Sequence, residues 1–71
     1  LGMNPKEIIV QDYTLIQFIF DDNKEVRATA EKDANQEWYE IERLLRELQI
    51  QGTKFSLIDV RFEKPYYEEQ K

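Results

Sequence analysis

The longest apolar run of the chain, residues 8–20, is apolar on both of its alternating faces. One set of alternate positions holds Thr14, Ile16, Phe18 and Phe20, and the other holds Tyr13, Leu15, Gln17 and Ile19. A strand with one solvated face would instead alternate apolar and polar residues. Only one helix is predicted after this run, and one helix covers one face of a sheet. The second face is therefore expected to be covered by the C-terminal tail, by a second copy of the chain or by another protein.

The sequence predicts a hairpin, then a helix, then a last strand. Residues 6–10 open an extended segment that is rich in β-branched residues, and residues 13–20 are the main strand. Asp21-Asp22-Asn23-Lys24 has turn composition, because Asp and Asn tolerate positive φ, so residues 25–29 are expected to return beside the main strand. Lys54–Glu63 is the last predicted strand. Residues 11–12 read as either a bulge or a turn, which leaves open whether a short first strand precedes the main one.

A single amphipathic helix is predicted between Asp33 and Gly52. Asp33 or Asn35 can cap its start, and Gly52 is a suitable C-terminal glycine. Apolar residues spaced three and four apart form its buried stripe, namely Trp38, Ile41, Leu45 and Leu48. The predicted core packs this stripe against Ile16, Phe18, Val26, Ala28, Ile58 and Val60.

The predicted fold is therefore α+β, with a small three-stranded, possibly four-stranded, mainly antiparallel sheet. The order is β-β-α-β, and the helix packs on one face of the sheet. Residues 6–64 form the predicted single domain, residues 1–5 a tag remnant (Leu1-Gly2) with an extended N-terminus, and residues 65–71 a C-terminal tail. No signal peptide or membrane span is evident, so a cytoplasmic protein is expected.

The composition argues against catalysis. The chain has no cysteine and no histidine, and Ser56 is its only serine, so no nucleophile has an activating base. Asp59 is expected to pair with Arg61 rather than to act as an acid or base. No spacing typical of a calcium loop or a phosphate loop is present. We therefore expect no enzyme activity, no cofactor and no bound metal.

The predicted function is protein binding through the uncovered sheet face or edge, by an adaptor, subunit or inhibitor that also forms a homodimer. The predicted protein-binding residues are Tyr13, Leu15, Ile19, Phe55, Leu57, Tyr66 and Tyr67. The tyrosine pair reads equally well as a flap over the exposed face or as a recognition element.

Charge supports a second hypothesis. Fifteen acidic residues oppose ten basic ones, so the net charge of −5 disfavours direct binding to nucleic acid or to anionic membranes. The alternative is an acidic inhibitor that imitates nucleic acid, such as a phage anti-defence protein.

A third hypothesis rests on a resemblance. The segment from Leu44 to Phe62, ending in Ile58-Asp59-Val60-Arg61-Phe62, resembles the last helix and strand of the extracytoplasmic β-domain of bacterial division proteins of the FtsQ and DivIB type. The resemblance implies a fragment of a division scaffold in which a partner binds at a strand edge.

Overall fold

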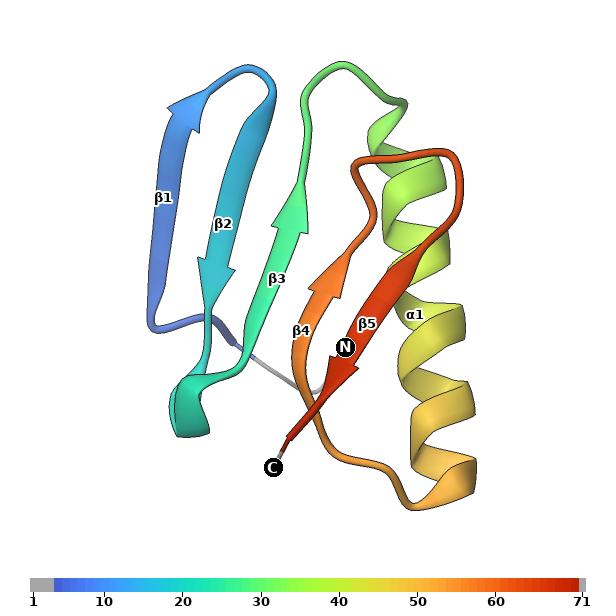
Figure 1. Cartoon of the computed structure of the whole chain (residues 1–71). Helices are drawn as coiled ribbons and strands as arrows, with labels where there is room; N and C mark the ends of the chain where they lie inside the picture. Colours follow the sequence, from blue (N-terminus) through green and yellow to red (C-terminus); the bar gives the residue numbers. More distant parts are fainter. Residues whose placement is uncertain (1–3, 71) are drawn as a thin grey trace.

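The computed structural model describes residues 4–70, so the expected tag remnant Leu1-Gly2 lies outside the described residues. Within residues 4–70, five strands form one sheet and a single α-helix packs on one of its faces (Figure 1). The elements are β1 (Glu7–Asp12), β2 (Leu15–Ile19), the short 3-10 helix η1 (Asp21–Asn23), β3 (Glu25–Ala28), α1 (Ala34–Gln51), β4 (Phe55–Asp59) and β5 (Tyr66–Glu69).

The strands lie side by side in the same order as in the chain. β3 and β4 are parallel because α1 connects them, and the other neighbouring strands are antiparallel. The α+β class is confirmed. The predicted strand number was wrong, because the described part of the chain forms five strands and the sheet is mixed.

The first additional strand comes from the start of the chain. β1 and β2 are joined by a tight turn in which the Asp12 carboxylate accepts the Thr14 backbone N–H at 2.7 Å. The register shifts between Val10 and Asp12, which marks a bulge in β1. Residues 11–12 thus end a true strand, and β2 begins at Leu15 rather than at Tyr13.

The second additional strand comes from residues predicted to form a tail. Tyr66–Glu69 pairs antiparallel with β4, where Tyr67 lies opposite Ile58 and Tyr66 opposite Asp59. The domain therefore extends past residue 64. Two adjacent glutamates gave this segment the composition of a frayed end, and pairing with β4 is what makes it a strand.

The predicted turns and caps agree with the structure. Asp22 and Asn23 have φ of 62° and 60°, and they lie in the loop that joins β2 to β3. The Asp33 carboxylate accepts the Gln36 backbone N–H at 3.0 Å and caps α1. Gly52 ends the helix with a φ of 72°.

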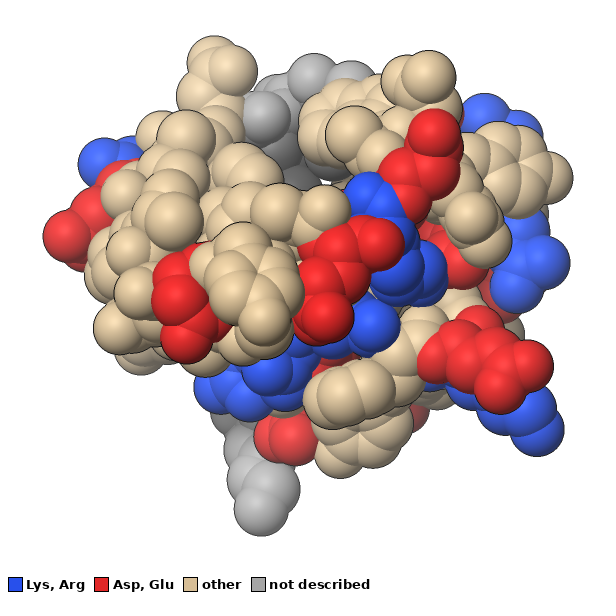
Figure 2. Space-filling model, turned by 90° about the horizontal axis from the view of Figure 1, so that it is seen from above, with Lys and Arg blue, Asp and Glu red and all other residues tan. Residues whose placement is uncertain are grey.

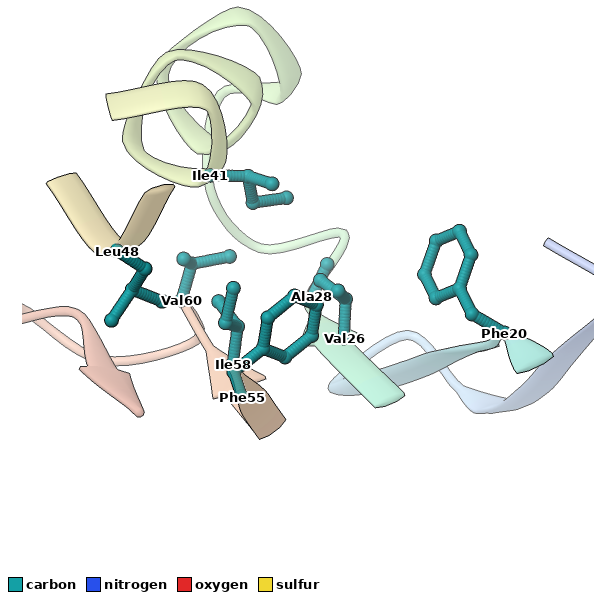
Figure 3. Packing of buried hydrophobic residues seen from close by; sticks show 8 residues of the cluster. All are labelled: Phe20, Val26, Ala28, Ile41, Leu48, Phe55, Ile58 and Val60. Atoms are coloured by element: carbon teal, nitrogen blue, oxygen red, sulfur yellow. The ribbon is translucent and has the colours of Figure 1, made fainter. Parts of the chain in front are cut away.

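The core lies between α1 and the β3–β4 part of the sheet (Figure 3). Its buried apolar residues are Phe20, Val26, Ala28, Ile41, Leu48, Phe55, Ile58 and Val60. Ile58 and Val60 are fully buried. Phe18 and Leu45, both predicted core residues, are partly buried against this cluster.

The predicted core was wrong at Trp38, whose side chain is 48% exposed. The buried position in the first turns of α1 belongs instead to Glu37, which is 6% exposed. Its carboxylate accepts the Thr29 backbone N–H at 2.9 Å, so a polar residue fills an apolar-facing position by bonding the end of β3.

Candidate functional site

The face of the sheet that carries α1 continues beyond the helix. By register, Ile8 lies opposite Phe18 and Val10 opposite Ile16. Phe18 and Ile16 in turn lie opposite the buried Val26 and Ala28. All these side chains share the helix-bearing face, but α1 lies over the β4 side of the sheet, and β1 and β2 are the strands farthest from it (Figures 1 and 3).

This uncovered region is apolar and exposed. Ile8 is 56% exposed and Val10 is 66% exposed, while Ile16 and Phe18 are partly buried. We call these four residues the β1–β2 patch. An exposed group of neighbouring apolar side chains is the usual mark of an interaction surface in a protein of this size.

The outer edge of β1 borders this patch. Within residues 4–70, β1 pairs with β2 alone, so its other side presents unpaired backbone groups. Such an edge can accept a strand from another chain. The patch and the free edge therefore form one continuous candidate binding surface.

The opposite face of the sheet, which we call the open face, carries a polar network. The Gln11 amide donates to Gln17 Oε1 at 3.0 Å, and the Gln17 amide donates to Glu25 Oε2 at 3.1 Å. Arg27 Nε donates to the same Glu25 oxygen at 2.6 Å. Arg27 also lies opposite Asp59 in the parallel β3–β4 pairing. This polar network crosses the centre of the open face.

Asp59 and Arg61 form the most buried ion pair of this network. Arg61 Nη2 lies 2.8 Å from Asp59 Oδ2, and Arg61 Nε donates to Oδ1 at 3.0 Å. The Arg61 backbone N–H adds a third bond to Oδ1 at 3.0 Å. The pairing predicted for these two residues is therefore confirmed.

The pKa of Asp59 is set by two opposed effects. Burial of the carboxylate raises its pKa, but the hydrogen bonds and the charge of Arg61 outweigh burial and hold the pKa below its ordinary value of 3.8. The pKa of Glu25 is lowered from 4.5 in the same way, since Arg27 and Gln17 outweigh burial. For Glu37, burial dominates and raises the pKa.

These shifts predict that the protein is destabilised by acid. The unfolded chain binds protons at Asp59 and Glu25 more readily than the folded chain does, so their stabilisation is present above their ordinary pKa values and is lost as pH falls through the lower folded values. Glu37 acts in the opposite sense, since its contribution is largest below its ordinary pKa of 4.5. We expect Asp59→Asn to cost about 1–3 kcal/mol of unfolding free energy at neutral pH. Urea unfolding at several pH values should show that this difference shrinks as the solution is acidified from about pH 6 to about pH 3, and a constant difference would contradict the assignment.

The structure places the predicted protein-binding residues in three different environments. Leu15, Ile19 and Leu57 are partly exposed on the open face, at the margins of the polar network. Tyr13 is 68% exposed in the β1–β2 turn, and Tyr66 is 51% exposed on β5. That these residues bind protein stays a prediction.

The expected open-face position of Phe55 was wrong, and Tyr67 does not form a flap over the open face. Phe55 is 5% exposed and belongs to the core, because the register of β4 shifts between Phe55 and Leu57 and reverses the alternation of its faces. Tyr67 lies opposite Ile58 and packs against the core. The tyrosine pair is thus split between the two faces of β5, and its second member covers the helix-bearing face rather than the open one.

Sequence reasoning missed Ile8 and Val10 as surface residues. The available signal was the run of three β-branched residues at positions 8–10, which places apolar side chains on both faces of this strand. Their exposure depends on how far α1 reaches across the sheet, which periodicity does not report.

Partly buried polar groups at the end of the sheet hold loops together. The Lys32 ammonium donates to the backbone carbonyls of Val60 at 2.8 Å and Phe62 at 3.2 Å. It also lies 3.0 Å from Glu40 Oε2. Every buried side-chain nitrogen or oxygen within residues 4–70 has a hydrogen-bond partner, so these groups serve the fold.

No group of three or more histidine, cysteine, aspartate or glutamate side chains in the described part of the chain is arranged to hold a metal ion. Across residues 4–70, no helix combines the length and apolar character needed to cross a membrane. Comparison with known proteins found no match for this chain among protein-family models, curated proteins or solved structures.

Proposed function

We propose that this protein is a small non-catalytic binding module, an adaptor, subunit or inhibitor, whose contact surface is the β1–β2 patch with the adjoining edge of β1. The observation that carries the proposal is the exposure of Ile8 and Val10 on a face whose other half is covered by α1. At about 25 cal/mol per Å² of buried apolar surface, covering these side chains stabilises a complex without any rearrangement of the domain.

The proposed contact surface lies on the helix-bearing face of the sheet and not on the open face. On the open face the apolar residues are separated by the network of Gln17, Glu25 and Arg27. Burying such a network under a partner would remove water from charged groups that are already paired with one another, and that desolvation is costly. The β1–β2 patch carries no such cost.

The imitation of nucleic acid is less well supported. Four acidic side chains, Glu25, Glu40, Glu47 and Asp59, are engaged with basic neighbours. Acidic and basic side chains also alternate over the surface seen in Figure 2 rather than forming a continuous acidic row. A partner whose affinity fell steeply with salt would favour this alternative, since apolar contact depends little on salt.

Position-specific photo-crosslinking tests the proposal. A photoreactive phenylalanine derivative replaces Val10 in one variant and Ile50 in another, because both side chains are well exposed, at 66% and 80%. We expect discrete protein adducts in the source cells from position 10 and none from position 50. Equal labelling from the two positions, or labelling that appears only when the probe is moved to Leu57, would overturn the proposed surface.

A further inference from the structure

We propose that the partner bound at the edge of β1 is a second copy of this chain. The two β1 strands pair antiparallel about a twofold axis perpendicular to the sheet, which joins the two sheets into one. This inference rests on the proposed function, because it names the occupant of the same surface. An isologous contact of this kind closes after two copies.

Of the two sheet edges, only β1 has a sequence suited to self-pairing. The other edge, β5, follows Pro65 and carries Glu68 beside Glu69. Antiparallel pairing of two such strands would bring four carboxylates together at a short edge, which is destabilising. The central residues of β1, Ile8 to Val10, are uncharged and β-branched.

The symmetry restricts the register of pairing. A twofold axis perpendicular to the sheet keeps both helices on one side, so residues that lie opposite each other must point to the same face. The side chains of a strand alternate between faces. The axis therefore passes through a residue position and not between two positions, which leaves Ile8, Ile9 or Val10 as the centre.

Only the register centred on Ile9 sets apolar residues opposite apolar residues and polar residues opposite polar residues. It sets Ile8 opposite Val10 of the second copy, and Glu7 opposite Gln11. The pairing ends there, because the bulge between Val10 and Asp12 interrupts the alternation of β1. A centre on Ile8 would set Glu7 against Ile9, and a centre on Val10 would set Ile8 against Asp12.

The proposed pairing also joins the β1–β2 patches of the two copies. In the dimer, Ile8 and Val10 each gain a β-branched neighbour on the helix-bearing face. The patches of the two copies become one apolar surface that lies between the two helices.

Cysteine crosslinking tests the register directly, because the natural chain has no cysteine and a single introduced thiol is unambiguous. Residues opposite each other in antiparallel strands have Cα atoms about 4.5–5.5 Å apart, within the span of a disulfide. We expect Ile9→Cys to form a disulfide-linked dimer under mild oxidation. An equimolar mixture of Ile8→Cys and Val10→Cys should crosslink faster than either variant alone, and Ile50→Cys should remain monomeric.

A charge on the strand should prevent dimerisation without unfolding the domain. Native molar mass by light scattering over a dilution series would compare Ile8→Lys with Ile50→Lys, the same change at an exposed helix position. We expect Ile8→Lys to raise the dimer dissociation constant about tenfold, because each dimer loses two cross-strand contacts between Ile8 and Val10 of the other copy. Both variants should keep the helical circular dichroism of the natural chain.

The outcomes separate this inference from the proposed function. A natural chain that stays monomeric at all concentrations, or that dimerises without forming the Ile9→Cys crosslink, would overturn the β1 pairing. Adducts from position 10 to a different protein would then leave the binding surface standing with another occupant. If position 10 gives no photo-crosslinked adduct and Ile9→Cys gives no disulfide-linked dimer, both the proposed function and the β1 pairing are overturned.

Discussion

Replacing Ile58 with alanine is expected to lower the free energy of unfolding by about 2–5 kcal/mol. Ile58 is fully buried in the middle of β4, beside Val26 of β3 and opposite Tyr67 of β5. A chain of this length has a total stability of roughly 4–11 kcal/mol. The variant is therefore expected to lie close to the limit of folding, which urea unfolding followed by circular dichroism would measure.

Ile50→Ala is the matched control for this substitution. Ile50 is 80% exposed in the last turn of α1, so the same atoms are removed without leaving a cavity. Its unfolding free energy should stay within about 0.5 kcal/mol of that of the natural chain. Equal effects at positions 50 and 58 would show that the core is not centred on β4.

Deleting residues 65–71 is expected to leave the chain largely unfolded. The deletion removes β5, so β4 becomes an edge strand and Ile58 loses Tyr67 as its neighbour on the helix-bearing face. The lost burial of Tyr67 costs about 1.5–3 kcal/mol. Each lost backbone hydrogen bond of the β4–β5 ladder costs about 0.5–1.5 kcal/mol more.

A chain that lacks only Lys71 serves as the control and is expected to unfold like the natural protein. Thermal unfolding and the dispersion of amide resonances would distinguish the two truncations. If the chain ending at Lys64 kept a cooperative transition at nearly the natural temperature, residues 65–71 would indeed be a tail, and the role of β5 as a structural strand would be wrong.

Local features of the fold could be predicted because short-range chemistry decides them. Asp33 bonds a backbone N–H only three residues away, and Gly52 adopts a positive φ that other residues disfavour. The same holds for the loop at Asp22 and Asn23. Each of these predictions depends on a few neighbouring residues and not on the rest of the molecule.

Features that depend on irregular strands could not be predicted in this way. A bulge in β4 reverses the alternation that assigned Phe55 to the open face, and nothing in the types of its neighbours marks that bulge. β5 exists because β4 offers it a backbone to pair with. Glu37 replaces Trp38 at the buried helix position because the end of β3 supplies a hydrogen-bond donor, which helical periodicity alone does not reveal.

The sequence by itself determined the α+β class, the position and ends of the helix, and the apolar character of both faces of the first strands, because periodicity and capping are local properties. Only the tertiary structure decided which apolar residues remain exposed. The reach of α1 across the sheet covers Val26 and Ile58 and leaves Ile8 and Val10 uncovered. That difference is set by the distance of each strand from the helix, and strand order is a long-range property of the whole chain.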